Sequence, residues 1–76
     1  MNFLSNKIQK YYEKKLKDAL QKLHLHQKMK DSLEAELRKN NTDDIIIKEI
    51  EKQEDIIEIW KKNIEKIKKE LEKLQK

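Results

Sequence analysis

The sequence carries two uninterrupted seven-residue repeats, separated by one short polar segment, Asn40-Asn41-Thr42-Asp43. In each repeat a line of mostly apolar residues advances by alternating steps of four and three. The first line consists of Tyr12, Leu16, Ala19, Leu23, His26, Lys30, Leu33 and Leu37. The second consists of Ile46, Ile50, Gln53, Ile57, Trp60, Ile64, Ile67, Leu71 and Leu74. A mean step of about 3.5 residues keeps one face of a helix against a partner. The sequence therefore predicts two helices that pack along these positions, which we call the seam.

The polar segment predicts the turn between the two helices. Neither Gly nor Pro occurs in the 76 residues, so the usual residues of turns and helix breaks are missing elsewhere. We predict an all-α fold with a first helix at about 4–39, a loop at about 40–42 and a second helix at about 43–75. A loop this short makes the helices antiparallel. The chain, 1–76, is thus predicted to be a single helical hairpin, a two-helix antiparallel coiled coil.

The position of the loop also predicts the start of the second helix and the pairing along the seam. Asn41 or Thr42 is the predicted N-cap of the second helix. The opposing pairs are Leu37 with Ile46, Leu33 with Ile50, Lys30 with Gln53, Leu23 with Trp60, Leu16 with Ile67, and Tyr12 with Leu71. Lys30 thus opposes Gln53, with His26 one layer away, so the polar interruptions of the two repeats coincide. A polar layer of this kind fixes the register at some cost in stability.

A second apolar stripe lies beside the seam. When the seam positions are named a and d, eight further apolar residues fall at c or g: Leu4, Ile8, Tyr11, Leu25, Met29, Ile45, Ile56 and Ile59. In an antiparallel pair the g positions of both helices flank the same side of the seam, so these residues should form one face, the c/g face. The opposite side, at the e positions, is mainly polar, with Leu20 and Ile47 as apolar exceptions. One-sided apolar surface of this extent is typical of an interface. The eight residues are therefore the candidate protein interface.

Charge is sorted along the chain in a way that bears on assembly. Residues 1–30 contain eight lysines and two acids, a net charge of +6. Residues 31–60 contain four bases and ten acids, a net charge of −6, and residues 61–76 contain seven lysines and three acids, a net charge of +4. In a hairpin the open end is then basic and the turn end acidic. We expect a homo-oligomer, an antiparallel dimer that forms a four-helix bundle, because that arrangement lays acidic tip beside basic end.

The basic open end is an alternative functional surface. Phosphate binding needs clustered cations, and tyrosines can stack on bases. The candidate nucleic-acid contacts are Lys7, Lys10, Tyr11, Lys14, Lys15, Lys17, Lys62, Lys66, Lys69 and Lys73. However, Arg38 is the only arginine, and arginine is the residue that reads bases and phosphates bidentately. Lysines at the outer positions of a coiled coil are usually only solvated. RNA or DNA binding is therefore the second hypothesis, behind protein interaction.

Nothing in the sequence points to catalysis, a metal, a cofactor or a small-molecule substrate. A catalytic site needs positioned groups in a concave pocket, which a two-helix hairpin does not offer. His24 and His26 are two residues apart and face different sides of a helix, whereas helical metal pairs are spaced by three or four. There is no Cys, which excludes disulfides and thiolate metal sites. No apolar run reaches the roughly 20 residues of a membrane span, and 1–8 lacks the apolar core of a secretory signal. We expect a non-enzymatic, cytoplasmic protein.

The function that the sequence favours is a protein-interaction module, a small regulator or inhibitor that acts on a larger protein through the c/g face. A purely structural spacer is a third hypothesis. In architecture alone, such a hairpin is similar to the plasmid copy-number RNA modulators, which dimerise into four-helix bundles, and to the RNA-binding hairpin arms of some tRNA synthetases. This likeness implies a phage or plasmid context. No residue motif is shared with either group, so no functional residue is carried over.

Overall fold

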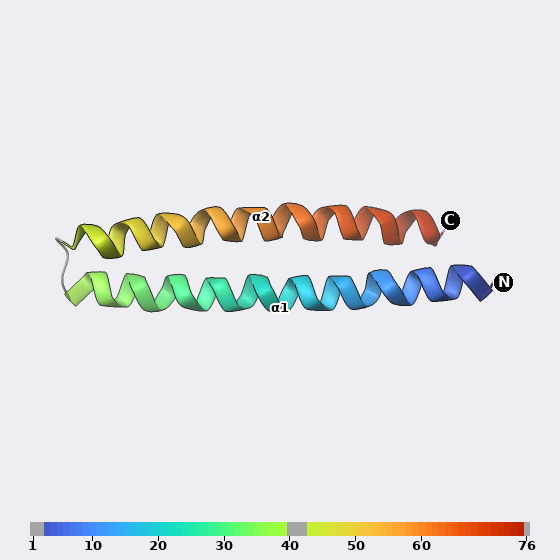
Figure 1. Cartoon of the computed structure of the whole chain (residues 1–76), viewed down its shortest axis with the longest axis horizontal. Coiled ribbons are helices and arrows are strands. Elements are labelled where there is room, and N and C mark those ends of the chain that lie inside the picture. Colours follow the sequence, from blue (N-terminus) through green and yellow to red (C-terminus); the bar gives the residue numbers. More distant parts are fainter. Residues whose placement is uncertain (1–2, 40–42, 76) are drawn as a thin grey trace.

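The computed structural model describes residues 3–39 and 43–75, and within these ranges the chain forms two α-helices and no strand. Helix α1 spans Phe3–Lys39 and helix α2 spans Asp44–Leu74. The helices run side by side in opposite directions, so that the end of α1 and the start of α2 lie at one end of the molecule, and the start of α1 and the end of α2 lie at the other (Figure 1). The predicted all-helical hairpin is therefore confirmed. The predicted loop at 40–42 lies outside the described residues.

Helix α2 is capped by a different residue from the predicted one. The backbone of Asp43 is extended, with φ −82° and ψ 101°. Its carboxylate accepts hydrogen bonds from the backbone N–H groups of Ile45 and Ile46, at 3.0 and 3.3 Å. The prediction of Asn41 or Thr42 as N-cap was therefore wrong. The second helix was expected to begin at about residue 43, with Asp43 inside its first turn. Asp43 instead precedes the helix, and its carboxylate accepts from two N–H groups that have no partner within the helix.

The two helices pack along the predicted seam. All the residues of both seam lines are buried or half-buried, although the residues on either side of them are mostly exposed. The most buried cluster is Ala19, Ile64 and Ile67, with Tyr12, Leu16, Leu23, Trp60 and Leu71 packed against it. This cluster contains both members of three predicted layers, which supports the predicted register. Ala19 is only 2% exposed, because its small side chain lies beside the large side chains of α2.

The polar layer within the seam is arranged differently from the prediction. Gln53 is only 5% exposed, and its amide oxygen lies 2.7 Å from Nδ1 of His26. The imidazole donates this hydrogen bond in the tautomer that carries its proton on Nδ1. Lys30, predicted to oppose Gln53, instead extends its ammonium to the carboxylate of Glu54, at 3.4 Å. An imidazole–amide pair can form its hydrogen bond inside the seam, whereas a lysine charge must reach toward water.

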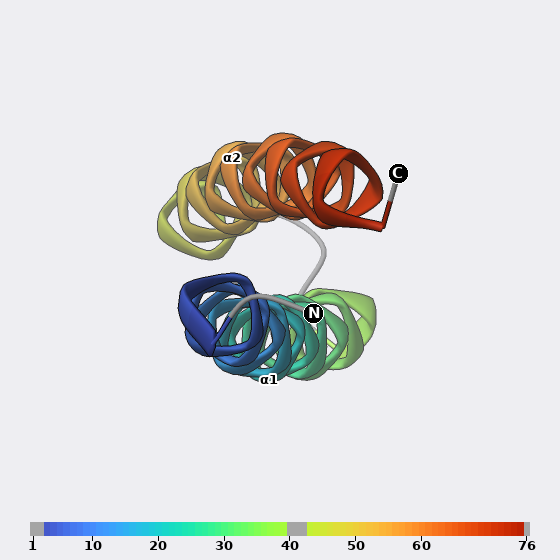
Figure 2. The same cartoon turned by 90° about the vertical axis from the view of Figure 1, so that its right-hand side faces the viewer.

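The hairpin is a thin rod, with Cα extents of 59 × 14 × 13 Å. Viewed from its open end, the two helices are wound about each other (Figure 2). At that end α1 extends beyond the last turn of α2 (Figure 1). Neither of the described helices has a stretch that is both long enough and apolar enough to cross a membrane. Because the rod is only two helices thick, each helix has one covered stripe and leaves its other sides open.

Candidate interaction surfaces

The c/g face is exposed along the length of the rod. Seven of its eight residues are exposed large side chains: Leu4, Ile8, Tyr11, Leu25, Met29, Ile45 and Ile59. Ile56 is half-buried. Ile45 and Ile59 are 76% and 64% exposed. These values are high for isoleucine, which is usually buried because removing its side chain from water is favourable. The packing of α1 on α2 therefore leaves these apolar side chains uncovered.

Side chains from both helices meet on this face near the middle of the rod. An open depression of about 370 Å³ is lined by Leu25, Lys28, Met29, Ser32 and Leu33 of α1 and by Glu49 and Gln53 of α2. Its base is formed by the seam residues Leu33 and Gln53, and its rim by residues at c, f and g. We call Leu25, Met29, Ile56 and Ile59 the central cluster. The depression brings c and g residues of α1 beside one g residue of α2, Glu49, whereas Ile56 and Ile59 do not line it.

The opposite side of the rod has fewer exposed large apolar side chains among the described residues. Leu20 and Ile47 are exposed there, but they lie on different helices, one toward the open end and the other near the turn. A depression of about 500 Å³ beside Leu20 is lined by α1 alone: Glu13, Leu16, Lys17, Leu20, Gln21 and His24. Further along this side, a hollow is lined mainly by polar residues, among them Gln27 and Lys61. The c/g face is therefore the better candidate for binding another protein.

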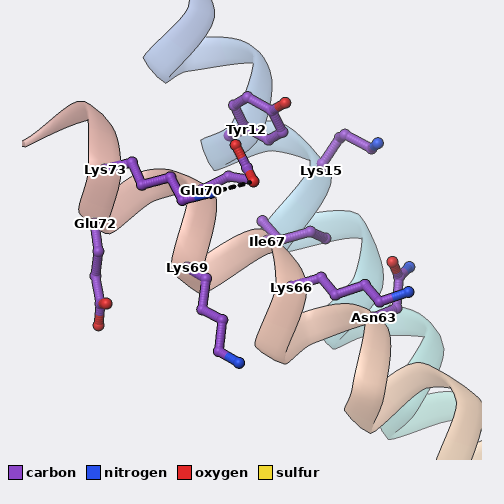
Figure 3. A pocket seen from close by; sticks show the side chains of 9 residues that line it. All are labelled: Tyr12, Lys15, Asn63, Lys66, Ile67, Lys69, Glu70, Glu72 and Lys73. Carbon is purple, nitrogen blue, oxygen red and sulfur yellow. Dashed lines mark hydrogen bonds and ion pairs between the residues drawn. The ribbon is translucent and has the colours of Figure 1, made fainter.

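A second depression, of about 570 Å³, lies at the basic open end. It is lined by Tyr12, Lys15, Asn63, Lys66, Ile67, Lys69, Glu70, Glu72 and Lys73. Lys15 and Lys66 extend on the same side of the helix pair, whereas Lys69 and Glu72 point away from α1 (Figure 3). Lys73 reaches across to the carboxylate of Glu70, at 3.4 Å (Figure 3). The depression is basic, but part of its charge is neutralised within it.

The ten candidate nucleic-acid residues are all exposed, but they do not form one face. Lys7 and Lys14 occupy f positions and Lys10 and Lys17 occupy b positions, on the sides of α1 that face away from α2. Lys62 lies at an outer f position of α2. Four of the ten line the open-end depression: Lys15, Lys66, Lys69 and Lys73. A nucleic-acid strand could contact only part of the predicted set at one time.

Tyr11 already has neighbours on its ring. The ammonium of Lys15 lies 5.3 Å from the ring centroid, a cation–π contact. The ring of Tyr12 packs edge-on against it, with centroids 5.3 Å apart and an interplanar angle of 74°. Stacking of a base on Tyr11 would require Lys15 to move. The predicted role of Tyr11 in base stacking therefore has less support than its place on the c/g face.

Two acidic residues of the c/g face were missed by the sequence analysis. Glu36 and Glu49 are exposed and occupy g positions near the turn. Lys15 and Lys66 are exposed and occupy g and c positions of the same face near the open end. Counting charge along the chain averaged these residues with others that lie on different sides of the helices. Their heptad positions were the signal that could have identified them.

Comparisons with protein-family profiles, with curated proteins and with solved structures found no match to this chain. Among the described residues, no group of three His, Cys, Asp or Glu side chains is placed to hold a metal ion. His24 is exposed and His26 lies in the seam, where it is bonded to Gln53. The candidate functional sites are therefore the two surfaces described above.

Proposed function

We propose that this chain is a non-enzymatic protein-interaction module whose binding surface is the c/g face. The observation that supports the proposal is the central cluster, to which both helices contribute and in which Leu25, Met29 and Ile59 are exposed. Fully burying one such side chain is worth about 1.5–3 kcal/mol. A partner that covers the cluster would therefore gain several such contributions at one place. A small regulator or inhibitor of a larger protein would use a face of this kind.

The thin core is a second argument for a partner. Within the described chain, the buried apolar residues are Ala19, Ile57, Ile64 and Ile67. Small domains with few buried residues usually need an additional source of stability, and association is one such source. A partner on the c/g face would cover the side of the seam that the depression now leaves open. Binding and folding stability of the hairpin should therefore increase together.

The test is a pair of matched double variants. In Ile56→Lys with Ile59→Lys, the central cluster gains two charges, so association through the c/g face should be lost. In the control, Leu20→Lys with Ile47→Lys, the same charges are added to the e side. Both variants should keep the helical circular dichroism of the wild type, because all four positions lie outside the seam.

Two measurements compare these chains with the wild type. Sedimentation at micromolar concentration reports self-association, and affinity capture from cells of the source organism, followed by mass spectrometry, reports other partners. We expect every association of the wild type to survive in the e-side variant and to disappear in the c/g variant. A c/g variant that retains all self-association and all captured partners would refute the proposal.

Nucleic-acid binding at the open end is the alternative, and the lysine-lined depression is the observation that favours it. A single strand that neutralises four lysines should bind about 50-fold more weakly when salt rises from roughly 50 to 200 mM, since affinity follows counterion release. Fluorescence anisotropy with labelled single-stranded RNA measures this, and Lys15→Gln with Lys66→Gln should reduce the salt dependence. Absence of binding at the lower salt concentration would remove this alternative.

A further inference from the structure

We infer that the c/g face binds a second copy of this chain, packed antiparallel so that α1 lies on α1 and α2 on α2 in a four-helix bundle. The inference rests on the proposed function, because it names the partner of the same face. It is supported by the order of side chains along that face. When the face is turned end for end about one axis, Leu25, Ile56 and Ile59 meet apolar residues, and Glu36 and Glu49 meet lysines.

The central cluster determines where the symmetry axis passes. Consider a two-fold axis that is perpendicular to the long axis of the rod and parallel to the c/g face. Rotation about this axis places α1 of one copy against α1 of the other, and α2 against α2, with each pair antiparallel. For the clusters to cover each other, the axis must pass through them. On α2, Ile56 then lies opposite Ile59 of the second copy, and Ile59 lies opposite Ile56. On α1, Leu25 lies next to Leu25 of the second copy.

The charged residues of the face fit the same axis. On α2, Glu49 lies opposite Lys66 of the second copy, because these two residues are centred on the point midway between Ile56 and Ile59. On α1, Glu36 lies opposite Lys15, because these two are centred between Leu25 and His26. The register of the hairpin places that point on α1 directly across from the point on α2. The two helices therefore indicate one axis independently, and symmetry forms each ion pair twice.

No like charges oppose each other at the remaining c and g positions in the overlap. The other facing pairs are Ser32 with Asp18, Met29 with Lys22, Lys52 with Asn63, and Ile45 with Glu70. Met29 can pack on the aliphatic part of the lysine side chain. In this register the two copies overlap along about 12–39 of α1 and 44–71 of α2, a length of about 42 Å at ~1.5 Å per residue.

A parallel pair of hairpins is disfavoured by the charged residues of the face. In a parallel two-fold pair, α1 of one copy lies on α2 of the other at the same height. Glu36 would then meet Glu49 of the second copy, and Lys15 would meet Lys66. Like charges that face each other in an interface weaken binding, so this arrangement is less stable. The antiparallel arrangement converts these repulsions into attractions.

Charge reversal tests the arrangement without changing an apolar side chain. One variant carries Glu36→Lys with Glu49→Lys, and the other carries Lys15→Glu with Lys66→Glu. Each variant alone faces like charges across the axis, so its dimer should dissociate at a concentration roughly 100-fold higher than the wild type. An equimolar mixture should form a heterodimer as tight as the wild-type homodimer, because every facing pair is again of opposite sign. Native mass spectrometry distinguishes the three dimers by mass.

Matched controls separate the face from net charge. Glu51→Lys with Glu58→Lys adds the same positive charge at exposed b positions, and Lys62→Glu with Lys69→Glu adds the same negative charge at exposed f positions. Both controls should dimerise as the wild type does. If they lose dimerisation as fully as the face variants, overall charge rather than facing pairs governs association and the inference is wrong.

The direction of the two copies has its own readout. The chain has no Cys, so a single introduced cysteine reports unambiguously with the cross-linker bismaleimidohexane. Leu25→Cys lies near the proposed axis and should cross-link to itself in the dimer. Lys39→Cys lies at the turn end of α1 and should not, because the two turn ends are at opposite ends of the bundle. The reverse result would show parallel packing and overturn the inference.

A wild-type chain that sediments as a monomer at micromolar concentration would also overturn the inference. That result would not by itself overturn the proposed function, since a different protein captured by the wild type and lost by the Ile56→Lys, Ile59→Lys variant would still identify the face as a binding surface. Failure of the second copy as partner and failure of the face are thus distinguishable. A wild-type dimer whose charge-reversed variants also dimerise normally would show a different register.

Discussion

Removing the hydrogen bond between His26 and Gln53 one partner at a time should destabilise the hairpin more than removing both. In His26→Leu the amide of Gln53, which is 5% exposed, stays in the seam without its partner, and an unsatisfied buried amide costs about 1–3 kcal/mol. In Gln53→Leu the half-buried imidazole can turn toward water, so we expect a loss of about 1 kcal/mol. The double leucine variant has no orphaned polar group and should be at least as stable as the wild type.

Thermal unfolding followed by circular dichroism at fixed chain concentration measures these differences. For a domain of this size, 1 kcal/mol corresponds to a change in Tm of roughly 4–8 °C. We therefore expect His26→Leu to lower Tm by about 5–15 °C and Gln53→Leu by about half as much, from the same scaling. The concentration must be matched, because association stabilises the folded chain. A double variant whose loss equals the sum of the two single losses would show that these side chains do not interact and that the polar layer is misplaced.

Three further predictions concern single residues. Asp43→Ala should lower the free energy of unfolding by about 1 kcal/mol in urea, whereas Asp43→Asn should keep most of the capping effect; equal losses would show that the carboxylate does not cap α2. Ile64→Ala should cost about 2–4 kcal/mol because it leaves a cavity in the core, whereas Ile59→Ala should hardly change the unfolding of dilute chain. Lys30→Leu should raise Tm, because packing in the seam outweighs a partly exposed ion pair with Glu54, worth at most about 1 kcal/mol. A lower Tm would show the opposite balance.

The hairpin could be predicted because its periodicity and its turn signal agree. Each seam line runs without an error through its helix, and only one polar segment interrupts the chain. The N-cap could not be predicted in the same way, because Asp43 and its neighbours are all good capping residues. The choice among them depends on backbone geometry that residue type does not specify. Fold class followed from the pattern, and the helix start from local geometry.

The polar layer and the c/g face show the same division. That His26, Lys30 and Gln53 lie close together followed from the register, but the choice of hydrogen-bond partner depended on desolvation of a charge. Heptad position predicted which apolar residues would be exposed, except that Ile56 is half-buried. The g position alone does not explain this difference, because Ile8 and Met29 are also g residues and are exposed. The match between Glu49 and Lys66 was missed because charges were counted along the chain and not along a face.

The position of the buried cluster has a mechanical consequence. Ala19 lies in the first half of α1, and Ile64 and Ile67 lie in the second half of α2, so all three are nearer the open end of the hairpin than the turn end. A force that draws the start of α1 and the end of α2 apart reaches the best-packed layers before it reaches the turn. Once those layers separate, the remaining layers include the His26–Gln53 pair and bury less apolar surface. They should therefore resist the pulling force less. The rod should therefore yield first at one high force near its open end and then unzip toward the turn at lower force.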